Sequence, residues 1–83
     1  MERLKNSLKV VGLKQSCKAV ARNRAELAYL AEDTEPYIAE SFKELCEEKA
    51  VEVIPVPTGK ELAKACKVEV STACAVILKT AES

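Results

Sequence analysis

Short apolar runs alternate with amphipathic segments along the chain, and this alternation limits the folds that it can adopt. Residues 27–31, LAYLA, and 74–78, CAVIL, are apolar throughout, which is typical of strands buried on both faces of a sheet. Between such runs, apolar residues recur at helical spacing. Helices that alternate with buried strands predict an α/β fold, a three-layer α/β/α sandwich around a small mixed four-stranded sheet.

Local signals set the expected boundaries of these elements. Pro36 suits the first position of a helix, and Pro57 ends a strand. Thr58 and Glu61 have the spacing of a capping box, which announces a further helix. We expect an amphipathic turn or two over 2–8, strands over 9–12, 27–31, 51–56 and 73–79, and helices over 13–23, 36–49 and 58–67.

Two of the helices have an apolar stripe that should face the sheet. In the first helix the expected buried stripe consists of Leu13, Cys17, Val20 and Ala21. In the second helix most glutamates lie opposite the apolar face, which consists of Ile38, Phe42, Leu45 and Cys46.

The length of 83 residues suits one small domain, so we assign residues 1–83 to a single domain. No apolar run approaches twenty residues and the N-terminal segment is polar, so we expect no membrane span, no signal peptide and a cytoplasmic location. Histidine is absent and the four cysteines are far apart, without a CxxC pair. We therefore expect no metal site and no cofactor, and cysteines that serve as small buried side chains.

Charge is balanced over the whole chain but is distributed unevenly, with a basic N-terminal part and an acidic middle. The helix after Gly12 starts without an acidic or hydroxyl residue to cap its free N–H groups. Lys14, Lys18 and Arg22 follow at intervals of four and form a basic stripe. Two interpretations stay open: an ordinary solvent-facing stripe, and a site at which nucleic-acid phosphate meets the helix start.

Catalytic motifs are missing from the sequence. There is no histidine to serve as a general base, no G-x-S-x-G elbow and, with two glycines in the chain, no P-loop or dinucleotide fingerprint. The acidic group of Glu32, Asp33 and Glu35 is open to two interpretations. It serves turn hydrogen bonding and places negative charge at the start of the helix at Pro36, or it forms a carboxylate pair or a cation site. We predict that the chain is not an enzyme.

Four ordered motifs resemble one known family. They are GLKQSCKAV at 12–20, AEDTEP at 31–36, LCEE at 45–48 and KELAKACKVEV at 60–70. Together they are similar to the kink-turn-binding ribosomal proteins, which include archaeal ribosomal and box C/D proteins and small bacterial ribosomal-protein-like homologues. Lys14 and Gln15 match the bacterial branch, where Lys-Gln replaces the archaeal Asn-Glu.

This resemblance implies an α/β/α sandwich that binds kink-turn RNA, a bent duplex with tandem sheared G·A pairs. By position, Lys14 and Gln15 would contact guanine edges, and Lys18 would reach a phosphate or an extruded nucleotide. Glu35 matches a family glutamate near the extruded base, and the loop 68–72 matches a segment that packs on exposed bases. The full set of expected RNA-binding residues is Gly12, Leu13, Lys14, Gln15, Lys18, Glu35, Lys60, Val68, Val70, Ser71 and Thr72.

The chain departs from the family pattern L-G-x-A-x-G, because Ala63 and Lys67 stand where that pattern has glycines. We expect a monomeric partner of structured RNA, bound to ribosomes or to a non-coding RNA. Val68 and Val70 have an alternative interpretation as the start of the last strand. Two functional alternatives stay open: a ribosome-associated subunit that binds protein through the acidic helix 36–49, and a thiol enzyme or redox sensor that uses Cys17 or Cys66.

Overall fold

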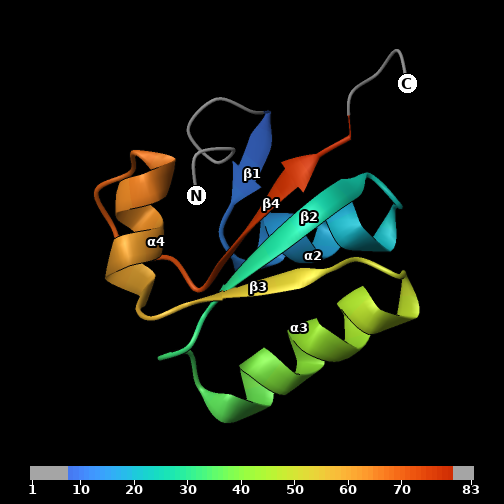
Figure 1. Cartoon of the computed structure of the whole chain (residues 1–83), viewed down its shortest axis with the longest axis horizontal. Helices are drawn as coiled ribbons and strands as arrows, with labels where there is room; N and C mark the ends of the chain where they lie inside the picture. Colours follow the sequence, from blue (N-terminus) through green and yellow to red (C-terminus); the bar gives the residue numbers. More distant parts are fainter. Residues whose placement is uncertain (1–7, 80–83) are drawn as a thin grey trace.

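The computed structural model describes residues 8–79, so nearly all of the turn expected over 2–8 lies outside the described residues. Three helices and four strands follow one another in this part of the chain (Figure 1). They are β1 (Lys9–Val11), α2 (Leu13–Ala21), β2 (Ala25–Ala31), α3 (Pro36–Glu48), β3 (Val53–Val56), α4 (Gly59–Cys66) and β4 (Cys74–Leu78).

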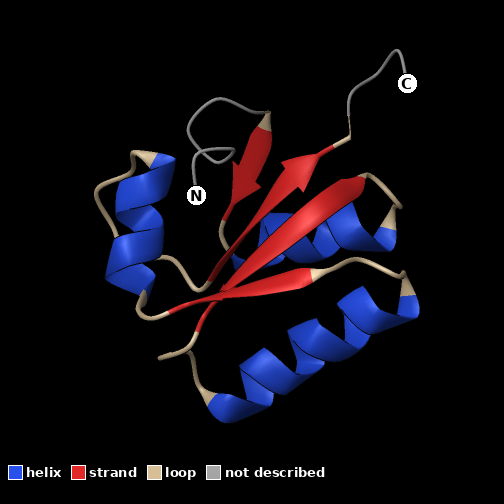
Figure 2. Ribbon diagram, in the orientation of Figure 1, coloured by secondary structure: helices blue, strands red, loops and turns tan. Residues whose placement is uncertain are grey.

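The four strands form one mixed sheet in the order β1-β4-β2-β3. β4 pairs antiparallel with both β1 and β2, whereas β2 and β3 are parallel. Helices α2 and α3 lie on one side of the sheet and α4 lies on the other (Figure 2). The predicted three-layer α/β/α sandwich with a mixed four-stranded sheet is confirmed.

The two faces of the sheet explain why β2 is apolar throughout. Successive side chains of a strand point to opposite faces. Ala28 and Leu30 therefore pack in the core beneath α2 and α3, while Leu27 and Tyr29 pack beneath α4. A strand with a hydrophobic core on each side has no solvent face on which polar residues would be favoured.

Strand direction brings the starts of all three helices to one edge of the sheet. Because β1 and β2 both run antiparallel to β4 and β3 runs parallel to β2, the carboxyl ends of β1, β2 and β3 share this edge. Each of these strands leads directly into a helix. The loop before β4 ends at the same edge, because β4 starts there.

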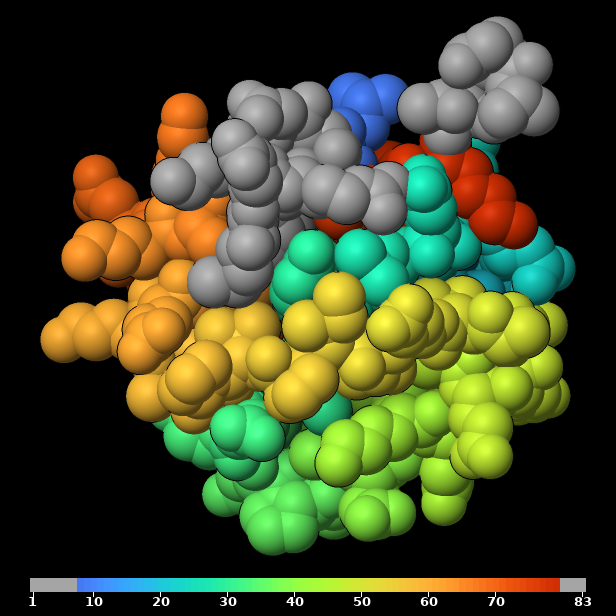
Figure 3. Space-filling model, in the orientation of Figure 1, coloured from blue at the N-terminus to red at the C-terminus, as the bar shows by residue number. Residues whose placement is uncertain are grey.

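β3 is shorter than expected, because it begins at Val53 rather than at residue 51. The N–H of Val51 donates to the carbonyl of Cys46 over 2.8 Å and so completes the end of α3 instead of a strand ladder. β3 also contains Pro55 and forms an outer strand of the sheet, the position at which a strand tolerates proline. Figure 3 shows this segment, in yellow, at the surface between α3 and α4.

The buried stripe of α2 differs in part from the prediction. Val20 is fully buried and Leu13 and Cys17 are half-buried, but Ala21 is exposed. The buried face is instead completed by Ser16 and Ala19. At about 100° per residue, positions 16, 19 and 20 centre the face away from position 21, so the prediction for Ala21 was wrong.

Candidate nucleic-acid interface

The N-terminus of α2 lies open at the edge of the sheet where the three helices begin. Gly12 is its N-cap residue, with φ 105° and ψ 153°, and within residues 8–79 no side chain caps this end. The Gly12 N–H donates to the carbonyl of Cys74 over 2.9 Å, which ties the helix start to β4. Amides of the first turn have no acceptor within the helix, so this end offers free N–H donors to an anion.

The basic stripe of α2 points away from the protein core. Lys14, Lys18 and Arg22 are exposed, and at about 100° per residue they lie on the side of the helix opposite Ser16 and Val20. Gln15 is exposed beside Lys14. Lys14 and Gln15 therefore project from the helix end that has free backbone donors, and Lys18 and Arg22 continue the stripe toward the other end of α2.

The N-terminus of α4, in contrast, is closed by the protein itself. The Glu61 N–H donates to Thr58 Oγ1 over 3.1 Å, as the predicted cap requires. The Gly59 N–H donates to Asp33 Oδ1 over 2.9 Å. Asp33 therefore connects the turn after β2 to the start of α4, by a long-range hydrogen bond and not by the bonding within a turn that the sequence suggests.

The start of α3 combines the predicted proline with an exposed carboxylate. Pro36 occupies the first turn as expected, and Glu35 is the N-cap residue. The carbonyl of Glu35 accepts hydrogen bonds from Ile38 and Ala39, while its side chain is exposed and makes no cap hydrogen bond among the described residues. Like α2, α3 therefore begins without a side-chain cap.

The segment between α4 and β4 is a loop with two valines directed to solvent. Val68 is 38% exposed and Val70 is 76% exposed. β4 begins only at Cys74, so the interpretation of these valines as the start of the last strand was wrong. Val68 and Val70 are therefore exposed apolar side chains in the loop that leads to β4.

Thr72 anchors this loop rather than presenting a side chain to solvent. It is buried, its N–H donates to the Gly59 carbonyl over 3.2 Å, and its Oγ1 donates to the Cys74 carbonyl over 3.0 Å. The structure therefore gives Thr72 a supporting position. Ser71, in contrast, is exposed.

An open hollow of about 340 Å³ joins the loop to the start of α3. It is lined by Asp33, Thr34, Glu35, Ile38, Gly59, Ser71, Thr72 and Ala73. The hollow brings Glu35 and Ser71 together, although 36 positions separate them in the sequence. Lys60 is the residue after Gly59 at the start of α4, and it is exposed.

A second hollow, of about 400 Å³, lies between α2 and α3. It is lined by Leu13, Cys17, Tyr37, Ile38, Ser41, Phe42 and Leu45. Tyr37 was not among the predicted site residues, yet it is 71% exposed. Helical spacing contained the signal, because position 37 falls outside the face formed by Ile38, Phe42 and Leu45.

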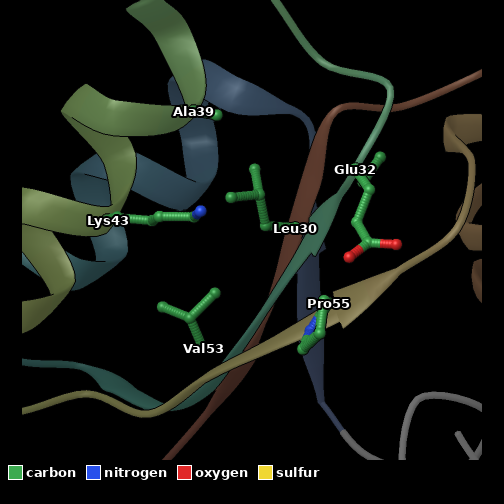
Figure 4. A pocket seen from close by; sticks show the side chains of 7 residues that line it. Leu30, Glu32, Ala39, Lys43, Val53 and Pro55 are labelled. Carbon is green, nitrogen blue, oxygen red and sulfur yellow. The ribbon is translucent and has the colours of Figure 1, made fainter. Parts of the chain in front are cut away.

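A third hollow, of about 490 Å³, lies between α3 and β3 (Figure 4). Glu32 and Lys43 are its charged lining residues, and in Figure 4 their side chains lie on opposite sides of Leu30. None of the predicted RNA-binding residues lines this hollow.

The thiols are poor candidates for reaction or metal binding. Burial raises the pKa of Cys17 and of Cys66, so both favour the protonated form at neutral pH. Cys66 is buried, as expected, whereas Cys17 is half-buried. Within residues 8–79, no three His, Cys, Asp or Glu side chains are grouped so that they could hold a metal ion. No described helix is long and apolar enough to cross a membrane.

Two bacterial relatives match most of this chain. An RNA-binding protein of Caldanaerobacter subterraneus subsp. tengcongensis is 39% identical over 67 residues, which cover 81% of this chain and 82% of that protein. An RNA-binding protein of Bacillus pumilus is 35% identical over 69 residues, covering 83% of this chain and 84% of that protein.

Solved structures share the fold. The 15.5kD RNA binding protein of Giardia lamblia superposes with a TM-score of 0.79 at 32% identity, over 89% of this chain and 62% of that one. The chain thus spans less than two thirds of the Giardia protein. A Bacillus halodurans protein of unknown function has a TM-score of 0.78 at 18% identity, over 87% of this chain and 72% of that one, which shows a shared fold.

Residues 2–83 match the sequence model of one protein family. This range includes the four motifs that resemble the kink-turn-binding proteins. The chain belongs to the ribosomal protein L7Ae/L30e/S12e/Gadd45 family.

Proposed function

We propose that this chain is an RNA-binding protein that recognises kink-turns with tandem sheared G·A pairs. The observation that carries the proposal is the open start of α2, where free backbone donors, Lys14 and Gln15 lie together at the surface. Two relatives of similar length, 39% and 35% identical, are themselves described as RNA-binding proteins. Family membership also makes the chain a non-enzymatic protein, as the sequence predicts.

Each part of the interface has a role in this proposal. The start of α2 enters the distorted groove, where Lys14 and Gln15 contact guanine edges and Gly12 and Leu13 lie against the backbone. RNA is read through such distorted sites because the major groove of a regular A-form duplex is too narrow for side chains.

The surrounding residues complete the proposed interface. Lys18 neutralises phosphate, and Glu35 lies by an extruded nucleotide in the hollow that it shares with Ser71. Val68 and Val70 pack on bases exposed at the kink. Lys60 adds a cation beside this loop. We further propose that residues 1–83 act as one domain, as a monomer, in the cytoplasm on ribosomal or other structured RNA.

The proposal is tested by comparing two RNAs that differ only in the sheared pairs. One is a kink-turn, and the other replaces its G·A pairs with Watson–Crick pairs. Binding is measured by titration at several salt concentrations. We expect tighter binding to the kink-turn, because the bent conformer alone presents the widened groove to α2.

Equal affinity for both RNAs would contradict kink-turn recognition. Salt should weaken the binding of both RNAs, with a slope of log binding constant against log salt concentration of roughly −0.7 to −0.9 per phosphate contact. Affinity that does not change with salt would remove the phosphate role of the basic stripe.

A further inference from the structure

Tyr37 is an aromatic side chain on the surface of a small chain that buries its other aromatics. The chain has three aromatic residues. Tyr29 is 3% exposed and Phe42 is fully buried, whereas Tyr37 is 71% exposed. A tyrosine ring that stays in water at a binding edge is available for a ligand to cover, and tyrosine is enriched at interfaces because its ring is apolar and its hydroxyl is polar.

The position of Tyr37 connects it to the start of α2. Tyr37 lies in the first turn of α3, and Leu13 is the first residue of α2. Both line the hollow of about 400 Å³ between the two helices. Ile38 lines this hollow and also the one that holds Glu35, so it lies between the two. The Tyr37 hollow therefore adjoins the proposed place of the nucleotide beside Glu35, and Ile38 is the one lining residue that the two hollows share.

The lining of the Tyr37 hollow fits a flat, partly polar group. Leu13 and Leu45, both half-buried, contribute apolar surface, and Ser41 contributes a hydroxyl group. Lys14 and Lys18 are exposed on the helix that forms the other side. A nucleobase with its attached phosphate uses all of these features, since the ring stacks, its polar edge bonds to a hydroxyl and the phosphate meets a cation.

From this arrangement we infer that one unpaired base of the bound RNA stacks on the Tyr37 ring over the hollow between α2 and α3. This inference rests on the proposed function and adds a second nucleotide site to it. A protein partner would use the apolar lining but has no need of the two lysines, so RNA is the occupant that the charges favour.

The test measures whether the contribution of the Tyr37 ring to binding depends on the presence of one particular base. Each unpaired nucleotide of the kink-turn RNA, and of its Watson–Crick counterpart, is replaced in turn by an abasic nucleotide. The dissociation constants are measured for the wild type, Tyr37→Phe and Tyr37→Leu. Loss of one particular base should weaken wild-type binding at least about fivefold, the effect of one stacked base. Tyr37→Phe should bind within about twofold of the wild type, because the ring is kept.

Tyr37→Leu should bind the intact RNA at least about fivefold more weakly and should be insensitive to loss of that same base, because the stacking partner is already gone. Since Tyr37 is exposed, thermal unfolding should be nearly unchanged in both variants, which separates stacking from folding. An equal effect of Tyr37→Leu on every RNA, or no effect on any RNA, would overturn the inference.

The two proposals fail in different ways. If the wild type prefers the kink-turn but no abasic position is coupled to Tyr37, the stacking site is wrong and the proposed function stands. If Tyr37 is coupled to one base but the two RNAs bind equally, kink-turn recognition is wrong and the stacking site stands. Failure to bind either RNA overturns both.

Discussion

At Gly59 an added Cβ atom would lie 2.9 Å from the carbonyl oxygen of Thr72, closer than real contacts of this kind. The Gly59→Ala variant must therefore shift either α4 or the loop before β4. We expect a loss of roughly 1 to 3 kcal/mol in the free energy of unfolding, measured by urea denaturation. RNA affinity should fall too, because the same close approach anchors the loop that carries Val70.

Lys60→Ala is the matched control for this prediction. Lys60 is the next residue of α4 and is exposed, so its truncation should change stability by less than about 0.5 kcal/mol. If Gly59→Ala were as stable as Lys60→Ala, the close approach to Thr72 would have no energetic weight.

Lys67 stands at the end of α4 with φ 63° and ψ 38°, in the left-handed region. Its N–H donates to the Lys64 carbonyl over 3.1 Å, and the Val68 N–H donates to the Ala63 carbonyl over 3.0 Å. This helix ending normally uses glycine, because a Cβ is strained there. The family pattern has a glycine at this position, and Lys67→Gly should raise the free energy of unfolding by about 1 kcal/mol.

Lys64→Gly provides the opposite control, since Lys64 lies within α4 and is exposed. Glycine inside a helix costs about 1 kcal/mol, so this variant should lose stability. Thermal unfolding measures the melting temperatures of Lys67→Gly and Lys64→Gly. A shift of both melting temperatures in the same direction would contradict the prediction.

Cys46 and Cys74 are buried in the same core cluster beneath α2 and α3. Burial, and secondarily the charge of Cys17, raises the pKa of Cys46 from 9.0 to about 11 and that of Cys74 to about 12. Above pH 9 the thiols of the unfolded chain lose protons that the folded protein keeps. The contribution of these thiols to the free energy of unfolding is therefore complete below pH 9 and is lost as pH rises toward the folded-state pKa values. The slope should reach about 1.4 kcal/mol per pH unit for each thiol.

Urea unfolding between about pH 8 and pH 10.5 measures this slope. A variant with Cys46→Ala and Cys74→Ala serves as the control, because it lacks both thiols and should lose stability less steeply with pH. An identical slope in the variant and the wild type would show that other groups cause the pH dependence.

Among the elements, α2 combines two kinds of interaction with RNA that mutation can separate. Lys14→Ala with Gln15→Ala should reduce the preference for kink-turn over Watson–Crick RNA, at about 1 to 3 kcal/mol for each guanine-edge interaction that the substitutions remove. Lys18→Ala should weaken the binding of both RNAs alike and lower the salt slope. Titration of both RNAs at two salt concentrations measures these effects.

Lys43→Ala is the control for α2, because Lys43 is an exposed cation on α3 that lines the separate hollow beside β3. It should leave the preference unchanged. If it lowered binding as much as Lys18→Ala, general positive charge rather than the position of α2 would explain RNA affinity.

At the scale of the whole molecule, β3 is an outer strand, and within residues 8–79 it pairs with β2 alone. The Ala28 N–H donates to the Glu52 carbonyl and the Glu32 N–H donates to the Val56 carbonyl. The backbone groups of even-numbered residues from 52 to 56 therefore point toward β2, and those of odd-numbered residues point away from the sheet. Two of the odd-numbered residues are Pro55 in β3 and Pro57 just after it, which have no N–H. The free edge therefore lacks two donors that another strand would need.

Pro55→Thr with Pro57→Thr restores these donors, and we expect the variant to associate as its concentration rises. The wild type should remain a monomer in sedimentation measurements over the same range. Thr58→Ser is a control at the next position, which leaves the edge unchanged. Monomeric behaviour of the proline variant would show that the prolines do not guard this edge.

Periodicity and turn signals were enough to predict the order and type of the elements, the three layers, Pro36 at the start of α3 and the Thr58 cap. These depend on residues a few positions apart and on whether one face or both faces of a segment are buried. The misplaced start of β3 and the exposed Ala21 depend instead on how neighbouring elements use their backbone groups and how a helix is rotated on the sheet.

Only tertiary structure placed the three helix starts and the loop before β4 at one edge, with Asp33 bonded to Gly59 and with Tyr37 and Leu13 lining one hollow. Asp33 and Gly59 are 26 positions apart, and no local pattern encodes such a pairing. The order β1-β4-β2-β3 decides which ends of the strands meet, because strand pairing joins segments that are remote in the chain.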